Sequence, residues 1–335
     1  MAVHVLHHGW CFDGAASSAL FAAFFRQRLG ARQVFRFIPK DHRPGDPYDP
    51  EDFIGADPAV GLDFRYSQHP AMTWYFDHHA SAFQSPGDRA HFLADASGQK
   101  FHDGGAASCA GFIARTVRQR FDCDLSAHAD LIAWAERIDA ADFPSPSMPV
   151  LLVEPALQLM TFVESNQDRE LTGVFIEDLA RRPLAVHAAA DYVQQIVAPR
   201  RAQNQADLAL IEGRAIVHDG VLAYDLLDQP VRAYNKFIPY YHHPAIRYVV
   251  ALTRGQDRRI KLTAGYNPWL PRTAREHSMA DLLEPFGGGG HPYVGGCSFD
   301  PDGEDHALSV VRSLVNVLRG AAAPTAPSAP SPSAP

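Results

Sequence analysis

Residues 73–79 read TWYFDHH, and this stretch decides the predicted fold of the first half of the chain. Its aromatic and apolar beginning is typical of a buried strand, which ends in an acidic residue followed by two histidines. Two earlier segments have the same form: AVGLDF at 59–64 ends beside Asp63, and Val3–His7 runs into the polar turn HGWCFDG at 8–14. Polar residues therefore follow three predicted strands.

Segments of helical composition alternate with these strands. Residues 15–28, 105–121 and 127–138 are predicted helices, and VFRFIP at 34–39 is a further strand. This alternation predicts an α/β fold with a mostly parallel sheet covered on both faces. Ligands of such sheets bind at the carboxyl ends of the strands, so we expect the polar residues at these ends to lie close together.

The second half predicts a smaller C-terminal α/β domain joined to the first by a helical connector. Strands are expected at 208–219, 221–227, 248–254 and 259–267, with helices at 278–284 and 306–318 and a glycine-rich turn at 287–290. The predicted domains are residues 1–165, a connector at 166–207, and residues 208–320. Residues 321–335 contain only Ala, Pro, Ser and Thr and are predicted to be a disordered tail.

Composition narrows the class of protein. The chain has 335 residues and a net charge of −8, which argues against a protein that coats nucleic acid by bulk electrostatics. Its four cysteines form no CxxC pair, and no apolar run approaches the roughly 18 residues of a membrane span. These features predict a cytoplasmic protein with reduced cysteines and no membrane partner.

The polar turns carry residues that suit a metal site. Carboxylates and neutral imidazoles are ligands that favour manganese or another divalent cation. Two such ions can share a bridging carboxylate, a role that suits Asp63, and can lower the pKa of a water that attacks phosphorus. The candidate ligands are His7, His8, Asp13, Asp63, Asp77, His78, His79, Asp139 and Asp142.

Three motifs in this order resemble the DHH phosphoesterase superfamily: HGWCFDG at 8–14, FDHHAS at 76–81 and GGGGHPYVGGCSF at 287–299. The last resembles the DHH-associated C-terminal domain of that superfamily. Its members include RecJ-type exonucleases, oligoribonuclease-like and cyclic-dinucleotide phosphodiesterases, and inorganic pyrophosphatases. The resemblance implies a DHH catalytic domain at residues 1–165 and a DHH-associated substrate-binding domain at 208–320.

The resemblance also implies a set of ligands. One ion would be held by Asp13, Asp63, His78 and Asp139, with Asp142 as the alternative to Asp139. The second would be held by Asp63, either His7 or His8, and Cys11. Because Cys11 stands where the family usually has an aspartate, the number of ions stays open, and a thiolate ligand would favour softer metals.

Catalytic and substrate-binding roles follow from the same resemblance. His79 is expected beside the scissile phosphate as a proton donor or charge stabiliser, and Asp77 is its catalytic neighbour in the motif. Glycines permit backbone N–H groups to approach an anion closely. The predicted substrate-binding residues are Gly288, Gly289, Gly290, His291, Arg232 and Lys236.

The resulting prediction is a metal-dependent phosphoesterase that hydrolyses phosphodiester bonds of short oligonucleotides or of linear or cyclic dinucleotides by metal-activated water. The alternatives are a pyrophosphatase or polyphosphatase, and a nucleotide-binding regulator that has lost turnover.

Each motif also has a purely structural interpretation. Asp13 could be a helix N-cap, Cys11 a small buried apolar residue and GGGG a simple loop. A homodimer is left open as the oligomeric state.

Overall fold

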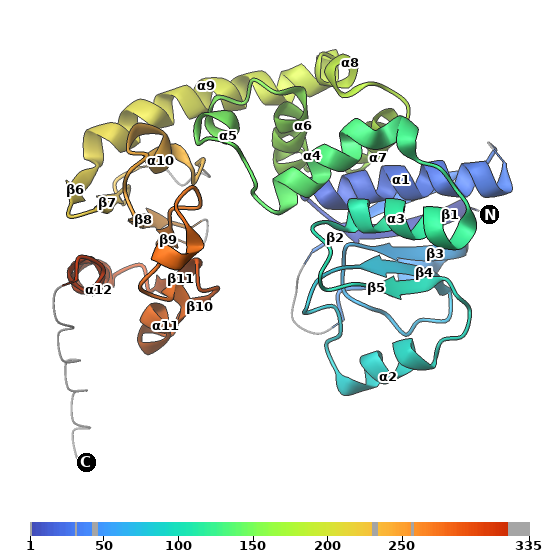
Figure 1. The fold of residues 1–335 in the computed structure, drawn as a ribbon, viewed down its shortest axis with the longest axis horizontal. Helices are drawn as coiled ribbons and strands as arrows, with labels where there is room; N and C mark the ends of the chain where they lie inside the picture. Colours follow the sequence, from blue (N-terminus) through green and yellow to red (C-terminus); the bar gives the residue numbers. More distant parts are fainter. Residues whose placement is uncertain (1, 31, 42–45, 230–233, 256–257, 321–335) are drawn as a thin grey trace. The chain divides into compact units, whose positions relative to one another are not determined.

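The computed structural model describes residues 2–30, 32–41, 46–229, 234–255 and 258–320. They form two compact units, the first within residues 1–143 and 152–201, the second within 144–151 and 202–335. Each unit contains a β-sheet and helices, as Figure 1 shows, so the predicted α/β fold class is confirmed. The predicted tail at 321–335 lies outside the described residues.

The sheet of the first unit has five parallel strands in the order β2-β1-β3-β4-β5. The strands are β1 (Ala2–His8), β2 (Phe35–Lys40), β3 (Ala56–Leu62), β4 (Met72–Asp77) and β5 (Lys100–His102). The three neighbouring strands β1, β3 and β4 are those that end in the polar motifs. Since all strands run in the same direction, the motifs meet at one edge of the sheet.

Helix α1 (Phe12–Leu29) is the central helix of this unit. Its residues from Phe12 to Ala22 are all buried, because it packs against the sheet on one side and against further helices on the others. A helix that is apolar on every face is typical of such a central position. Its neighbours are α3 (Cys109–Phe121), α4 (Ala129–Asp139), α6 (Pro155–Ser165) and α7 (Arg169–Leu179).

A smaller apolar cluster covers the opposite face of the same sheet. It contains Leu6, Ile38, Phe64 and Met72, and Phe53 of the short 3-10 helix η1 (Pro50–Phe53) packs against it. Figure 1 shows α2 (Pro86–Ala94) on the side of the sheet away from α1 and α3. The sheet is therefore enclosed on both faces, as the alternating sequence pattern predicts.

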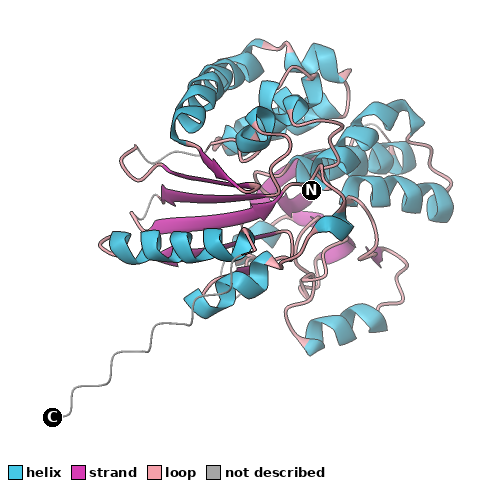
Figure 2. Ribbon diagram, turned by 60° about the vertical axis from the view of Figure 1, so that its left-hand side comes forward, coloured by secondary structure: helices cyan, strands magenta, loops and turns pink. Residues whose placement is uncertain are grey.

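The second unit contains a six-stranded mixed sheet in the order β10-β11-β9-β8-β7-β6. Figure 2 shows helices on both of its faces, and each face has its own apolar cluster. The strands are β6 (Ile216–His218), β7 (Val221–Asp225), β8 (Tyr248–Arg254), β9 (Ile260–Tyr266), β10 (Gly289–Gly290) and β11 (Val294–Phe299). The helices are α5 (Ser147–Leu151), α10 (Ile238–His242), α11 (Met279–Leu283) and α12 (Glu304–Leu318).

Two segments differ from the sequence prediction. The strand expected at 208–219 is wrong for most of its length, because α9 (Asp191–Arg214) continues to Arg214. Its apolar residues Leu208 and Ile211 are three positions apart and are both buried in one cluster, which is helical rather than strand periodicity. In the expected connector, α8 is Leu184–Ala188, and α7 packs against α1 and β2 within the first unit.

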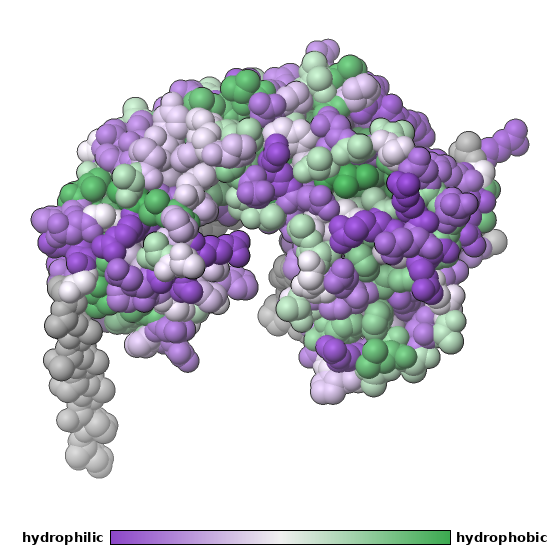
Figure 3. Space-filling model, in the orientation of Figure 1, coloured by the Kyte–Doolittle hydropathy of each residue, from purple (hydrophilic) through white to green (hydrophobic). Residues whose placement is uncertain are grey.

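The surface mixes polar and apolar residues. On the face drawn in Figure 3, hydrophilic and hydrophobic side chains are interspersed over both units. Isolated exposed apolar side chains of this kind are normal for folded proteins. Within the described residues, no helix has the length and apolar character needed to cross a membrane.

The close contact between α1 and the end of β1 requires glycine at position 14. A Cβ atom on Gly14 would lie 2.3 Å from the carbonyl oxygen of His8, which is a backbone atom and cannot rotate away. We expect Gly14→Ala to destabilise the fold by about 1–3 kcal/mol, a usual cost of overpacking. Urea denaturation followed by circular dichroism measures this change.

Gly173 in α7 supplies the matched control, because nothing lies within 4 Å of the Cβ position there. Gly173→Ala should leave stability unchanged or raise it by about 0.5–1 kcal/mol, since alanine favours the helix. Equal stability of Gly14→Ala and the wild-type protein would contradict the described packing of α1 on β1.

Candidate metal centre

Three carboxylates surround the imidazole of His78 at the carboxyl edge of the first sheet. Nε2 of His78 lies 3.4 Å from an oxygen of Asp63, 3.4 Å from one of Asp139 and 3.8 Å from one of Asp13. These side chains come from the end of β3, the end of α4 and the first turn of α1. Residues far apart in the chain therefore converge on one imidazole nitrogen.

Local hydrogen bonds fix the orientation of two of these groups. Nδ1 of His78 donates to the carbonyl oxygen of Ala106 at 3.0 Å, which leaves Nε2 facing the carboxylates. Asp13 accepts hydrogen bonds from the amides of Cys109 (2.6 Å) and Ala110 (3.0 Å) at the start of α3. The N-cap interpretation of Asp13 is therefore wrong, because Cys11 is the N-cap of α1 and Ser108 that of α3. Asp13 instead pairs with the first two amides of α3.

Asp63 is the most unusual member of the group. Its side chain is 1% exposed, and neither carboxylate oxygen accepts a hydrogen bond from the described residues. Its backbone adopts a left-handed conformation with φ of 55°, uncommon for a residue other than glycine. A buried carboxylate without hydrogen bonds is costly unless a positive charge compensates it.

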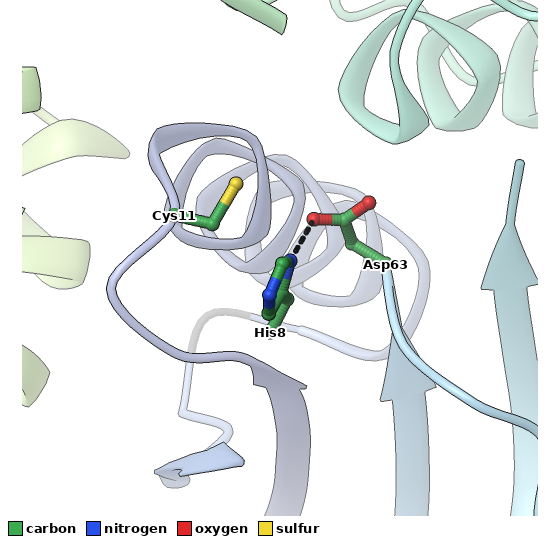
Figure 4. A group of neighbouring side chains, drawn as sticks. All are labelled: His8, Cys11 and Asp63. Atoms are coloured by element: carbon green, nitrogen blue, oxygen red, sulfur yellow. Dashed lines mark ion pairs between the residues drawn. The ribbon is translucent and has the colours of Figure 1, made fainter. Parts of the chain in front are cut away.

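His8 and Cys11 lie on the other side of Asp63. Nδ1 of His8 is 3.6 Å from Oδ2 of Asp63, and a ligand atom of Cys11 lies within 4.8 Å of both. Figure 4 shows His8 at the end of β1, Cys11 before α1, and the sulfur directed to the same side as the Asp63 carboxylate. Asp63 therefore has one group of candidate ligands on each side, consistent with the geometry expected of a bridging residue.

The structure separates the two histidines that the sequence left as alternatives. Adjacent strand residues point to opposite faces, so His7 faces away from the group around Asp63. Nδ1 of His7 contacts the carbonyl oxygen of His8 at 2.9 Å, and its ring lines a cavity of about 10 Å³ with Phe162 and Asn166. Burial lowers the pKa of His7 to about 4. Among the described residues His8, together with Asp63 and Cys11, belongs to a group of neighbouring candidate ligand atoms, whereas His7 belongs to none.

The structure also places the two alternatives Asp139 and Asp142 differently. Asp139 is the last residue of α4 and lies beside His78, whereas Asp142 belongs to no group of neighbouring ligand atoms among the described residues. The helix ends between them, and Ala141 adopts a left-handed conformation with φ of 50°. The chain therefore turns before Asp142 can reach the group.

His79 is oriented by Asp77. Nδ1 of His79 donates to Oδ1 of Asp77 at 2.8 Å, and the same oxygen accepts the amide of His78. The hydroxyl of Tyr75 lies 3.0 Å from Oδ2 of Asp77. Asp77 is fully buried and positions the imidazole, which is 36% exposed. Tyr75 was not among the predicted residues, although it is two positions before Asp77 and so lies on the same face of the strand.

The imidazoles and carboxylates of this group shift one another's pKa values. Burial alone would lower the pKa of His78, but Asp63 and the Ala106 carbonyl raise it to about 10. Burial would raise the pKa of Asp63, but His78 and His8 lower it to about 2. Burial and the charge of Asp63 raise the pKa of Asp13 and of Asp139. The group therefore needs positive charge, which a divalent cation also supplies.

The glycine-rich segment of the second unit is a short strand rather than an open loop. Gly289 and Gly290 form β10 and pair with Gly296 and Gly295 of β11. Its close packing requires glycine, because a Cβ on Gly288 would lie 2.6 Å from the carbonyl oxygen of Gly296.

The amides around β10 are largely used within the fold. Those of Gly287, Gly288 and His291 donate to carbonyl oxygens of Glu284, Leu283 and Val294. They are therefore unavailable to an anion. The imidazole of His291 and the ammonium of Lys236 are on exposed residues, and Arg232 lies outside the described residues.

A scan against protein-family models gives no match, and no curated protein matches the chain. Solved structures do match. A pGpG-specific phosphodiesterase, PggH from Vibrio cholerae, has a TM-score of 0.68 at 17% identity, covering 94% of this chain and 99% of that one.

Two further structures are similar. RecJ from Thermus thermophilus in complex with Mn²⁺ has a TM-score of 0.54 at 14% identity, covering 94% of this chain and 52% of RecJ. The DHH domain of a protein from a family of ribosomal proteins has a TM-score of 0.52 at 14% identity, covering 95% of this chain and 87% of that one. At these identities the likeness establishes the fold. The chain shares its fold with the phosphodiesterase PggH, with RecJ and with this DHH domain.

Proposed function

We propose that this protein is a metal-dependent phosphoesterase that hydrolyses phosphodiester bonds of short oligonucleotides or of linear or cyclic dinucleotides. The observation that carries the proposal is the position of Asp63, a buried carboxylate without hydrogen bonds between two groups of candidate ligands. A group of this composition suits divalent cations that prefer oxygen and nitrogen ligands.

The residues divide into two candidate positions for a cation. Asp13, Asp63, His78 and Asp139 would hold the first, and Asp63, His8 and Cys11 the second. A bound divalent cation, manganese for example, would supply charge to neutralise phosphoryl oxygens and would lower the pKa of a water molecule. The Ala106 carbonyl supports this role, because it holds the tautomer of His78 that leaves Nε2 for a ligand.

His79 is better suited to proton transfer than to metal binding. Its Nδ1 is engaged with Asp77, and that hydrogen bond raises its pKa. An imidazole that is partly exposed and held by a buried carboxylate can donate a proton to a leaving oxygen or stabilise charge on a phosphate. Asp77 then acts as a positioning residue.

The substrate class rests on the overall likeness as well as on the site. The similarity to PggH extends over nearly the full length of both chains, and that protein is described as specific for pGpG. The net charge of −8 also favours a small substrate over long nucleic acid.

The substrate class can be tested by incubating the protein and Mn²⁺ with pGpG, longer oligonucleotides, cyclic dinucleotides or pyrophosphate. The shorter nucleotide substrates should yield mononucleotides. Hydrolysis of pyrophosphate alone would contradict the proposal.

Asp63→Asn should abolish both metal binding and hydrolysis. Mn²⁺ should raise the melting temperature of the wild-type protein, because a ligand that binds only the folded state stabilises it. It should not raise that of the variant. The loss of metal affinity should exceed the roughly 10- to 100-fold that follows removal of an outer hydrogen-bond partner. Differential scanning fluorimetry with and without Mn²⁺ measures the shift.

Asp142→Asn is the matched control, since it removes an exposed carboxylate just beyond α4. It should keep the melting shift and the activity of the wild-type protein. Binding of Mn²⁺ by Asp63→Asn with wild-type affinity would show that the cation is held elsewhere.

Cys11 makes a separate prediction about the second position. Co²⁺ bound through a thiolate has an intense sulfur-to-metal charge-transfer absorption, so the wild-type protein should show this band in its ultraviolet spectrum. Cys11→Ser should lose the band, whereas Cys297→Ser, which alters a buried cysteine of the second unit, should keep it. Retention of the band in Cys11→Ser would exclude Cys11 as its source.

His79→Ala should separate catalysis from metal binding. Loss of a general acid usually lowers the rate by roughly 10²- to 10⁴-fold, so kcat should fall in this range. The Mn²⁺-dependent melting shift should persist, because Nδ1 of His79 is already engaged by Asp77. A variant that loses the shift as well would identify His79 as a metal ligand.

A further inference from the structure

A third histidine contacts the segment that carries His78 and His79. His102 is the last residue of β5, and its Nε2 lies 2.9 Å from the carbonyl oxygen of His79. Because a carbonyl oxygen only accepts hydrogen bonds, Nε2 of His102 carries a proton and donates it. His102 lies outside the three sequence motifs, and it belongs to no group of neighbouring candidate ligand atoms among the described residues.

The carbonyl oxygen of His79 accepts a second hydrogen bond, from the amide of Ala82 at 3.1 Å. A carbonyl oxygen has two lone pairs, and both are used here. Since the peptide group is planar, fixing this carbonyl also fixes the backbone rotation on the carboxyl side of His79. One donor comes from the turn itself, and the other comes from the neighbouring strand β5.

The amino side of His79 is fixed by separate contacts. Oδ1 of Asp77 accepts the amides of His78 (2.8 Å) and His79 (3.2 Å) and also Nδ1 of His79 (2.8 Å). The amide of Asp103 donates to the carbonyl oxygen of Asp77 at 3.1 Å, where β5 lies beside β4. Asp77 therefore orients the imidazole of His79, while His102 holds the backbone from which that imidazole extends.

Aromatic side chains hold the ring of His102 in turn. Its centroid lies 5.1 Å from that of Phe83 and 6.4 Å from that of Phe92, in edge-to-face arrangements. The ring of Tyr66 contacts both phenylalanines at 5.7 Å. We call Tyr66, Phe83 and Phe92 the aromatic cluster. Because such contacts favour particular ring orientations, the donor of His102 is directed to the His79 carbonyl before any substrate binds.

We propose that His102 is a positioning residue that keeps the imidazole of His79 in place for proton transfer to the leaving oxygen. This role rests on the proposed function, in which His79 donates that proton. His102 does not touch the reacting atoms and acts through the backbone of His79. A displacement of about 1 Å can lower a rate by about 10²-fold. The effect should appear in kcat rather than in metal binding, because the carbonyl of Ala106 orients His78 separately.

The first test compares His102→Leu, which removes the donor, with His102→Gln, whose side-chain amide can still donate. With pGpG and Mn²⁺, His102→Leu should lower kcat roughly 10- to 100-fold, the usual effect of removing an outer hydrogen-bond partner. Its KM and its Mn²⁺-dependent melting shift should stay at wild-type values. His102→Gln should recover most of the lost rate. Equal losses in both variants, or no loss in His102→Leu, would overturn the proposal.

His91→Leu is the matched control, because it removes an imidazole that also lies beside the aromatic cluster. Nδ1 of His91 contacts the hydroxyl of Tyr66 at 2.9 Å rather than the backbone of His79. This variant should keep the wild-type kcat. A fall as large as that in His102→Leu would assign the effect to packing of the aromatic cluster and would contradict a role for the donor.

A double-mutant cycle identifies the residue through which His102 acts. In His79→Ala the imidazole is absent, so adding His102→Leu should cause no further loss of kcat. Independent losses that multiply in the double variant would place the effect of His102 elsewhere and would refute the proposal.

The leaving group supplies a second readout. The p-nitrophenolate released from bis(p-nitrophenyl) phosphate is a weak base and needs no proton from a general acid. His102→Leu should therefore hydrolyse this substrate at close to the wild-type rate, although it is slow with pGpG. An equal loss with both substrates would indicate general damage to the site rather than displacement of His79.

The positioning role and the proposed function fail in different ways. NMR spectroscopy of ¹⁵N-labelled protein measures exchange of the Nδ1 proton of His79 with solvent, which requires no turnover. His102→Leu should speed this exchange several-fold, and His91→Leu should not. If the wild-type protein hydrolyses no phosphodiester but His102→Leu speeds the exchange, the positioning of His79 stands and the function fails. If hydrolysis proceeds and His102→Leu keeps the wild-type kcat and exchange rate, the positioning fails and the function stands.

Discussion

The structure of the first unit depends on three carboxylates that approach one imidazole at the edge of a parallel sheet. Asp13 and Asp63 are buried, and together with the more exposed Asp139 they would repel one another strongly without positive charge between them. Protonated His78 supplies some of that charge, yet both oxygens of Asp63 still lack hydrogen bonds within the described structure. Burying these carboxylate oxygens without hydrogen bonds costs free energy, which a bound divalent cation would offset. The helix terminus that holds Asp13 and the carbonyl that orients His78 both serve this local electrostatic requirement.

The sequence was sufficient to predict that this group forms, because a parallel sheet brings the ends of adjacent strands together. It could not decide between neighbouring residues of the same chemistry. His7 and His8 differ only in the face of β1 on which they lie, which depends on strand register. Asp139 and Asp142 differ only in where α4 ends. The role of Ala106 had no signal in the sequence, since a backbone carbonyl carries no residue identity.

The second unit was harder to predict for two physical reasons. Leu208 and Ile211 sit in a short apolar segment that fits both a strand and a helix, and the continuation of α9 resolved it. The four glycines of GGGGH suggested amides open to an anion, but close strand pairing also requires glycine, and several of these amides bind carbonyls of the fold. The same residue type thus serves two purposes that composition does not distinguish.

The most direct test of the central claim is a crystal structure of the protein grown with Mn²⁺, with data collected at the manganese absorption edge. The account predicts an anomalous difference peak within coordination distance of Asp13, Asp63, His78 and Asp139. A second peak between Asp63, His8 and Cys11 would extend the same account to two ions. An ordered active site without a peak at these residues, or a peak bound elsewhere, would contradict it.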